Sequence, residues 1–66
     1  MTEILAQIDA PHFCAGIVLR DDVVIEAADI VKYMRRNRWT RDQVRAYCER
    51  KGWKVSVVSI SQVVTP

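Results

Sequence analysis

The chain has 66 residues, half of them hydrophobic, and a net charge of +2. This length allows one domain with a thin core and leaves little room for an enclosed pocket. Two cysteines are too few for the disulfide framework of a small secreted domain, and the start of the chain lacks the pattern of a signal peptide. No apolar run approaches the roughly 18 residues of a membrane span. We therefore expect residues 1–66 to form one cytoplasmic domain without membrane contact.

The first segment, residues 1–11, leaves two structures open. Ile4, Leu5 and Ile8 share one face of a helix, which Pro11 would end. The stretch is also short enough to be an irregular arm. We expect either a short helix or an N-terminal arm here.

Two strands joined by a tight turn are predicted next. Residues 13–19 are almost continuously apolar, which favours a central place in a sheet. Asp21 and Asp22 follow Arg20 and predict a hairpin turn, because aspartate tolerates turn conformations and bonds its own backbone. Residues 23–27 then form the second strand.

A short helix is expected over residues 30–36. Asp29 stands where it can cap the first turn. Asn37 is the expected end, because asparagine accepts the left-handed conformation better than most residues.

A second helix is predicted over residues 41–51 from several local signals. Thr40 and Gln43 have the spacing of a capping box, and Trp39 stands where a hydrophobic staple would begin. Gly52 provides the left-handed end that commonly closes a helix.

The third strand is expected over residues 53–60, before a loose tail over residues 62–66. Its alternation changes phase at Val57 and Val58, which indicates either a bulge or burial on both faces. The element order β-β-α-α-β predicts an α+β domain with a three-stranded antiparallel sheet and both helices on one face.

The residues that could carry catalysis or bind metal are few. His12 is the only histidine, and it could pair with Cys14 or Cys48 as a nucleophile dyad, but no further partner for such a site is apparent. These three residues also lack the close paired spacing of zinc ligands. We expect both cysteines to be reduced and mostly buried, because buried cysteines commonly act as small hydrophobic residues. No glycine-rich phosphate loop occurs. We therefore predict no enzymatic activity, cofactor or metal.

Charge is strongly segregated along the chain. Nine basic residues between Lys32 and Lys54 face only Asp42 and Glu49, which gives this segment +7 and leaves −5 on the rest. A phosphate backbone would meet several of these cations at once and release counterions. An aromatic side chain among arginines, here Trp39, is typical of single-strand binding proteins. The candidate binding residues are Arg35, Arg36, Arg38, Arg41 and Arg45. We expect them to form one electropositive patch, with Glu3, Asp9, Asp21, Asp22 and Glu26 elsewhere.

Two alternatives to nucleic-acid binding stay open. The basic face can be a solvated helix surface, since Arg45 has Glu49 four residues on and Asp42 three residues before as possible partners. It can also contact an acidic or nucleic-acid-binding host protein. A structural role through self-association of strand edges is the main alternative function, and we expect a homodimer because a three-stranded sheet has two unpaired edges.

A set of core and capping residues gives the chain a family resemblance that covers roughly residues 12–58. The matching stretches are residues 12–19, 26–28, 31–34, 39–40, 44–45, 47–48 and 51–53. In these positions the chain resembles short bacteriophage and prophage accessory proteins to which no activity is assigned. The resemblance implies an accessory phage product in a bacterial cytoplasm. Very small phage proteins often act by binding a host protein or nucleoprotein, as anti-CRISPR proteins do, and this analogy is one of context only.

Overall fold

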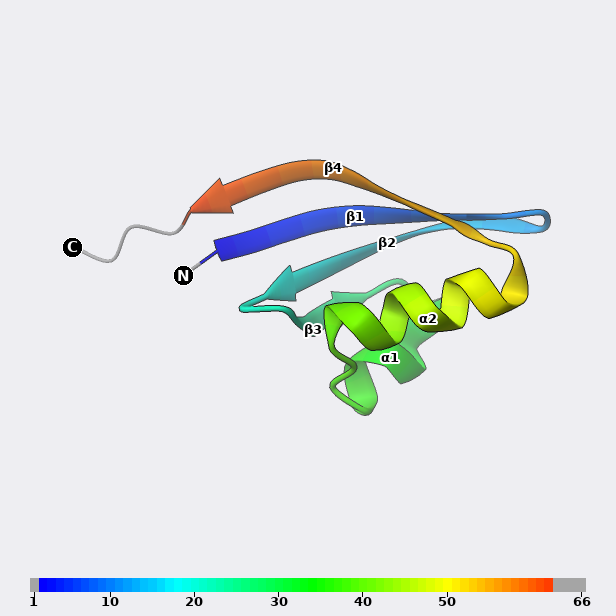
Figure 1. Ribbon diagram of the computed structural model, residues 1–66. Coiled ribbons are helices and arrows are strands. Elements are labelled where there is room, and N and C mark those ends of the chain that lie inside the picture. Colours follow the sequence, from blue (N-terminus) through cyan, green and yellow to red (C-terminus); the bar gives the residue numbers. More distant parts are fainter. Residues whose placement is uncertain (1, 63–66) are drawn as a thin grey trace.

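A computed structural model describes residues 2–62 and shows one antiparallel sheet with two helices (Figure 1). The strand order in the sheet is β3-β2-β1-β4. The elements in chain order are β1 (Thr2–Ala10), β2 (Phe13–Arg20), β3 (Val23–Ala27), a 3-10 turn (Asp29–Val31), α1 (Lys32–Arg36), α2 (Arg41–Lys51) and β4 (Lys54–Gln62). The predicted α+β class is confirmed, but the sheet has four strands rather than three.

The fourth strand is the N-terminal segment, so the predicted arm or short helix was wrong. β1 pairs with β2 from Glu3 opposite Arg20 to Ala10 opposite Phe13, and its other edge pairs with β4. Ile4, Ala6 and Ile8 point to the core at a spacing of two residues, which is the period of a strand. The helix prediction depended on placing Leu5 on one face with Ile4 and Ile8. In the strand, Leu5 is exposed on the face opposite the core.

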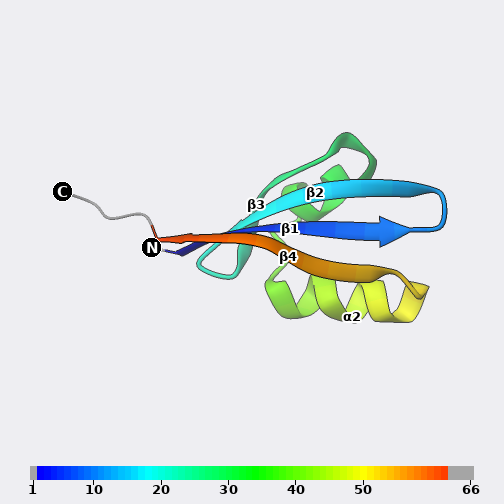
Figure 2. The same cartoon turned by 90° about the horizontal axis from the view of Figure 1, so that it is seen from above.

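The core lies on one face of the sheet, where α1 and α2 cover it (Figure 2). Alternate residues of the strands point towards the helices, as the alternation of side chains in a sheet requires. The buried residues are Ile4, Ala6, Ile8, Ala15, Ile17, Leu19, Val24, Val31, Met34, Val44 and Cys48. The prediction that both helices lie on one face is confirmed, and β2 has the predicted interior position.

The turn between β2 and β3 follows the sequence signal. Asp21 and Asp22 have φ angles of 51° and 65°, and two successive positive φ angles are typical of the tight hairpin turns whose twist matches that of the strands. The predicted turn is confirmed.

Helix α2 is also where the local signals place it. The Gln43 backbone N–H donates to Thr40 Oγ1 at 3.3 Å, and the Thr40 N–H donates to Gln43 Oε1 at 2.8 Å. Gly52 has φ 75° at the other end. The capping box and the glycine end are both confirmed.

Helix α1 ends at Asn37 as predicted, but its start and the residue in the left-handed conformation differ from the prediction. The 3-10 turn that leads into it receives no side-chain cap, so the capping role assigned to Asp29 was wrong. Asn37 has φ −93°, and it is Arg38 that adopts the left-handed conformation, with φ 49°. The Asn37 side chain donates to the Tyr33 carbonyl oxygen at 2.9 Å, so Asn37 caps the helix without leaving the right-handed region.

Strand β4 contains the predicted bulge. Ser59 pairs with Leu5 and Val57 pairs with Ala6, so Val58 is the extra residue. Gln62 is part of the strand, whereas residues 63–66 of the predicted tail lie outside the described residues. Neither helix of the described chain has the length and apolar character needed to cross a membrane.

Candidate anion-binding surface

The five predicted arginines are all exposed, but the fold divides them into two groups. Arg35, Arg36 and Arg38 line an open concavity of about 790 Å³ beside β3, and Arg41 and Arg45 line a separate groove of about 150 Å³ between α2 and the sheet. A single continuous patch was predicted. The residues 39–40 between the two groups connect them along the chain.

The larger concavity has an apolar wall and a basic rim. β3 provides the wall through Val23, Val24, Ile25 and Ala27. Lys32 stands on the rim with the three arginines, and Asp29 is the acidic residue that shares the concavity. Arg35 and Arg36 lie in the last turn of α1, where the partly negative carbonyl groups of the helix end favour basic residues.

Arg38 is held by a specific helix ending. Its backbone N–H donates to the Arg35 carbonyl oxygen at 3.2 Å, and the next N–H, of Trp39, donates to the Met34 carbonyl oxygen at 3.0 Å. This pair of bonds is a Schellman motif, in which the first donor is the residue in the left-handed conformation. Arg38 therefore occupies a backbone position that glycine ordinarily fills.

Helix α2 ends in the same motif, but with a glycine in the left-handed position. Gly52 N–H donates to the Glu49 carbonyl oxygen at 3.2 Å, and Trp53 N–H donates to the Cys48 carbonyl oxygen at 2.8 Å. Both motifs have a tryptophan after the left-handed residue. The two helix ends therefore differ mainly in having arginine or glycine in that position.

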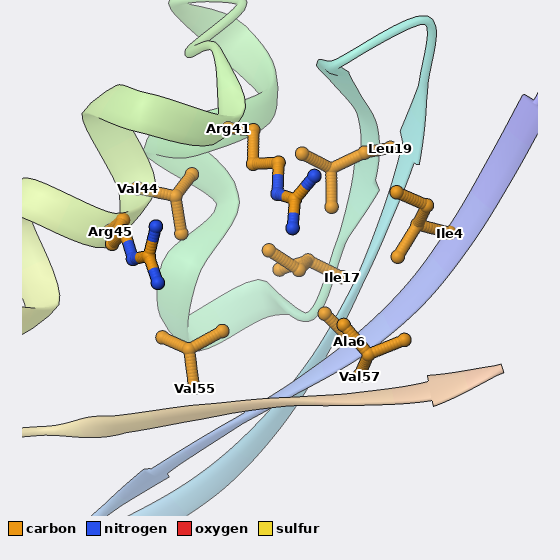
Figure 3. Close-up of a pocket in the computed structure, with 9 residues that line it drawn as sticks. All are labelled: Ile4, Ala6, Ile17, Leu19, Arg41, Val44, Arg45, Val55 and Val57. Atoms are coloured by element: carbon orange, nitrogen blue, oxygen red, sulfur yellow. The ribbon is translucent and has the colours of Figure 1, made fainter. Parts of the chain in front are cut away.

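The groove under Arg41 and Arg45 combines charge with an apolar floor (Figure 3). Both guanidinium groups extend from α2 over the opening. The apolar lining residues are Ile4, Ala6, Ile17, Leu19, Val44, Val55 and Val57. The groove can therefore accept an apolar group beside an anion.

Few of these cations are neutralised by acidic neighbours. Between residues 2 and 62 there are two ion pairs, Arg20 with Glu3 at 3.3 Å and Arg45 with Glu49 at 4.0 Å. Of the two partners proposed for Arg45, Glu49 is the one used. The side chains of this second pair are about three-quarters exposed, so it stabilises the fold little.

The prediction that the acidic residues lie away from the arginines was wrong for Asp22. Asp22, in the turn between β2 and β3, shares a small concavity at the start of α2 with Arg41 and Arg45. The Arg41 N–H also donates to the Asp22 carbonyl oxygen at 2.8 Å. Two carboxylates, Asp22 and Asp42, thus accompany two arginines there, whereas Asp29 alone accompanies four cations in the larger concavity.

All five aromatic residues form one cluster that the sequence alone did not reveal. The rings of Trp39, Tyr33 and Tyr47 contact one another edge to face, with centroids 5.1 to 5.9 Å apart. Trp53 and Phe13 continue the cluster from Tyr47. Burial raises the pKa of Tyr33 to about 12. Trp39 is thus engaged in packing and is not a free platform for stacking a nucleobase.

The histidine and the cysteines are far from forming a joint site. His12 is exposed in the turn between β1 and β2. Cys48 is buried under α2, whereas Cys14 is exposed, and its thiol donates to Asp9 Oδ1 at 3.3 Å on the uncovered face. The hydrogen bond to Asp9 raises the pKa of the Cys14 thiol. The prediction that both cysteines are buried was wrong for Cys14, because the strand period turns it away from the helices.

The described part of the chain also lacks other chemical centres. Among residues 2–62, no three histidine, cysteine or carboxylate side chains lie close enough to hold a metal ion. No polar or charged side chain in this range is buried.

Comparisons with protein-family models, with curated proteins and with solved structures gave no match for this chain. The arginine concavity and the groove are therefore interpreted from their own residues.

Proposed function

We propose that this chain is a non-enzymatic binding protein that holds the phosphate backbone of a nucleic acid on its exposed arginines. The contacts come mainly from Arg35, Arg36 and Arg38, with Arg41 and Arg45 extending the surface. The observation that carries this proposal is the left-handed conformation of Arg38, whose φ is 49°.

A left-handed conformation is costly for any residue with a β-carbon. The cost is roughly 1 kcal/mol relative to glycine. The motif at the end of α2 avoids this cost with Gly52. Arg38 also forms no ion pair within the described chain. Arg38 thus holds a strained conformation at the end of its helix without neutralising an acidic neighbour, which supports a role in binding a partner.

The distribution of the cations favours a polymer of phosphates over a single anion. The arginines lie around an open concavity and continue into a second groove, and only an extended ligand can contact both. Each neutralised phosphate releases counterions, so binding should weaken steeply with salt. Because Trp39 is packed among other rings, we expect recognition of the backbone rather than of base edges.

The resemblance to phage accessory proteins supports the setting of this proposal. In that setting the protein acts in the bacterial cytoplasm on nucleic acid of the host or the phage. An acidic surface on a host protein is the competing partner, and the experiment below separates the two.

Charge reversal of the surface is the direct test. The double variant Arg36→Glu, Arg38→Glu should keep the melting temperature, because exposed charges contribute little to stability. It should bind a DNA or RNA oligonucleotide at least about tenfold more weakly in fluorescence polarisation. The salt slope of log Kd should also become smaller, because fewer phosphates are neutralised.

The matched control is Arg50→Glu, Lys51→Glu, which makes the same change in net charge at the other end of α2. It should weaken binding much less than the first pair. Equal losses in the two variants would mean that only net charge matters, which would contradict the proposed surface. If the wild type binds no oligonucleotide at low salt but retains a host protein through the same arginines, the nucleic-acid assignment fails.

Arg38→Gly tests whether an arginine is kept in the left-handed position for binding. This variant should raise the free energy of unfolding by about 1 kcal/mol, since glycine adopts the left-handed conformation without strain. It should also weaken oligonucleotide binding. A variant that is more stable and binds as well as the wild type would show that the arginine has no role in binding.

A further inference from the structure

The two edges of the sheet are β3 and β4, and only the β4 edge is long, apolar and uncovered. β4 has nine residues, and Lys54 is its one charged residue. Its aliphatic side chains are 39% exposed at Val55, 49% at Val57, 56% at Val58 and 64% at Ile60. Edge strands of monomeric proteins commonly carry charges or coverings that prevent pairing with another chain. This strand lacks them over residues 55–61.

The bulge places the apolar residues of β4 on one face. Val55, Val57 and Ile60 pair with Ile8, Ala6 and Ile4, which all point towards the helices. In a regular strand of the same sequence, Ile60 would lie on the opposite face from Val55, because the two are five residues apart.

The pattern along β4 is also self-complementary. From the point between Val57 and Val58, the sequence reads valine, serine and an aliphatic residue in both directions. One half is Val57, Ser56 and Val55, and the other half is Val58, Ser59 and Ile60. Antiparallel pairing of two β4 strands about this point sets Val57 against Val58 and Val55 against Ile60. It sets Ser56 against Ser59 on the other face. A two-fold interface requires this kind of match, because each copy offers the same surface.

We propose that two copies of this chain associate through their β4 edges in this register and form a continuous eight-stranded sheet. The two-fold axis passes between Val57 and Val58. This interface lies away from the concavity of Arg35, Arg36 and Arg38 and borders the groove of Arg41 and Arg45, which Val55 and Val57 also line. The inference does not depend on the proposed function.

The position of α2 fits the same symmetry. Its residues share grooves with β4 residues 54–57 and not with residues 58–61. In Figure 2, α2 lies along the first part of β4. Antiparallel pairing places the covered half of one copy beside the bare half of the other. Each α2 then lies next to the uncovered Val58 and Ile60 of the partner copy.

Charge also permits the pairing. Lys54 lies opposite Asp9 of its own β1, and across the seam it would face Ser61 of the other copy. No like charges therefore meet along β4, in contrast to edge strands that use lysines to repel a copy.

The size of the surface sets the expected affinity. An interface of ordinary size buries roughly 800 Å² on each partner, about one sixth of the 4858 Å² that this chain exposes. The β4 edge with the adjoining mouth of the groove is smaller than the roughly 20–30 residues of such an interface. We therefore expect a dissociation constant in the micromolar range rather than a permanent dimer.

Sedimentation velocity between about 1 and 100 μM tests the association. The wild type should change from monomer to dimer over this range, and Val58→Lys should raise the dissociation constant at least about tenfold by opposing charges at the seam. Ile30→Lys is the matched control, because Ile30 is 55% exposed and lies away from β4. It should dimerise like the wild type.

Disulfide trapping tests the register. In a Cys14→Ser background, Val55→Cys and Ile60→Cys should cross-link when the two variants are mixed, because facing residues in a sheet lie within disulfide range. Each variant alone should cross-link far less, since Val55 does not face Val55 in this register.

Three results would overturn the inference. These are a monomeric wild type at about 100 μM, equal effects of Val58→Lys and Ile30→Lys, or cross-linking of each single variant as efficient as that of the mixture. Circular dichroism checks that Val58→Lys is folded, and Ile60→Lys replaces it if it is not.

Discussion

The two edge strands of this sheet differ in whether another part of the chain covers them. β3 has five residues, and the start of its free edge, at Val23 and Val24, is covered by the chain itself. Val24 N–H donates to the Trp39 carbonyl oxygen at 2.9 Å, and Thr40 forms a bridge with Val23. We call residues 39–41, which make these contacts, the 39–41 strap. β4, nearly twice as long, has no such cover over residues 55–61.

The difference shows how the fold separates two surfaces. The 39–41 strap covers the start of the β3 edge and also positions Arg38, which precedes it, and Arg41, its last residue. The arginines are thus fixed by backbone hydrogen bonds rather than by a flexible loop. The β4 edge carries none of the five arginines and stays available for a second copy. The following predictions test whether the strap closes its edge as described.

Trp39→Ala should have the largest effect. It removes the ring that contacts Tyr33 and Tyr47 at the strap, at a cost of about 3 kcal/mol in the free energy of unfolding. It should also free the β3 edge and promote aggregation. Urea unfolding and light scattering measure the two effects, with Trp39→Phe as the control that keeps a ring. A loss below about 1 kcal/mol would show that the strap does not depend on this cluster.

Thr40→Ala should have a smaller effect, about 0.5–2 kcal/mol, because it removes the hydroxyl that accepts from the Gln43 N–H. The strap then loses its anchor to α2 while its own backbone bonds to β3 persist. Thr40→Ser keeps the acceptor and should unfold close to the wild type. Equal urea midpoints for the alanine and serine variants would exclude a stabilising role for this cap.

Alkaline pH should have the smallest effect on the strap. The pKa of Tyr33 is raised from 10.0 to about 12, so the folded chain retains a proton that the unfolded chain releases in this interval. Stability is therefore unaffected below about pH 10 and falls as pH rises towards 12. Tyr33→Phe should fall less over the same interval, as urea midpoints at about pH 9 and about pH 11 would show. Identical slopes for both proteins would contradict the assignment.

Local signals predicted the parts of this fold that depend on neighbours in sequence. The capping box of Thr40, the end at Gly52 and the turn at Asp21 each use contacts within a few residues, and each was found as predicted. The bulge at Val58 was also visible, because it changes the phase of the alternation.

The parts that failed depend on distant partners or on a local competition. Residues 2–10 are a strand because β2 and β4 offer edges on both sides, and nothing within the segment reveals those edges. Asn37 has the propensity for the left-handed position, but as the C-cap it bonds the Tyr33 carbonyl oxygen with its side chain at φ −93°, and the left-handed position falls on Arg38.

The candidate site was predictable in its residues and not in its shape. The segregated charge identified exposed arginines, because a helix face without apolar residues must face solvent. Their division between a concavity beside β3 and a groove beside β4 follows from the path of the 39–41 strap. That path is set by backbone bonds to Val24 and Asp22, which no local pattern encodes.

Amide hydrogen exchange as a function of protein concentration tests the contrast between the two edges most directly. Between about 1 and 100 μM, protection of amides in β4 should rise, because their free edge pairs with a second copy. Protection in β3 should not change, because its edge is already closed by the 39–41 strap. Concentration-dependent protection in β3, or no change in either strand, would contradict the account.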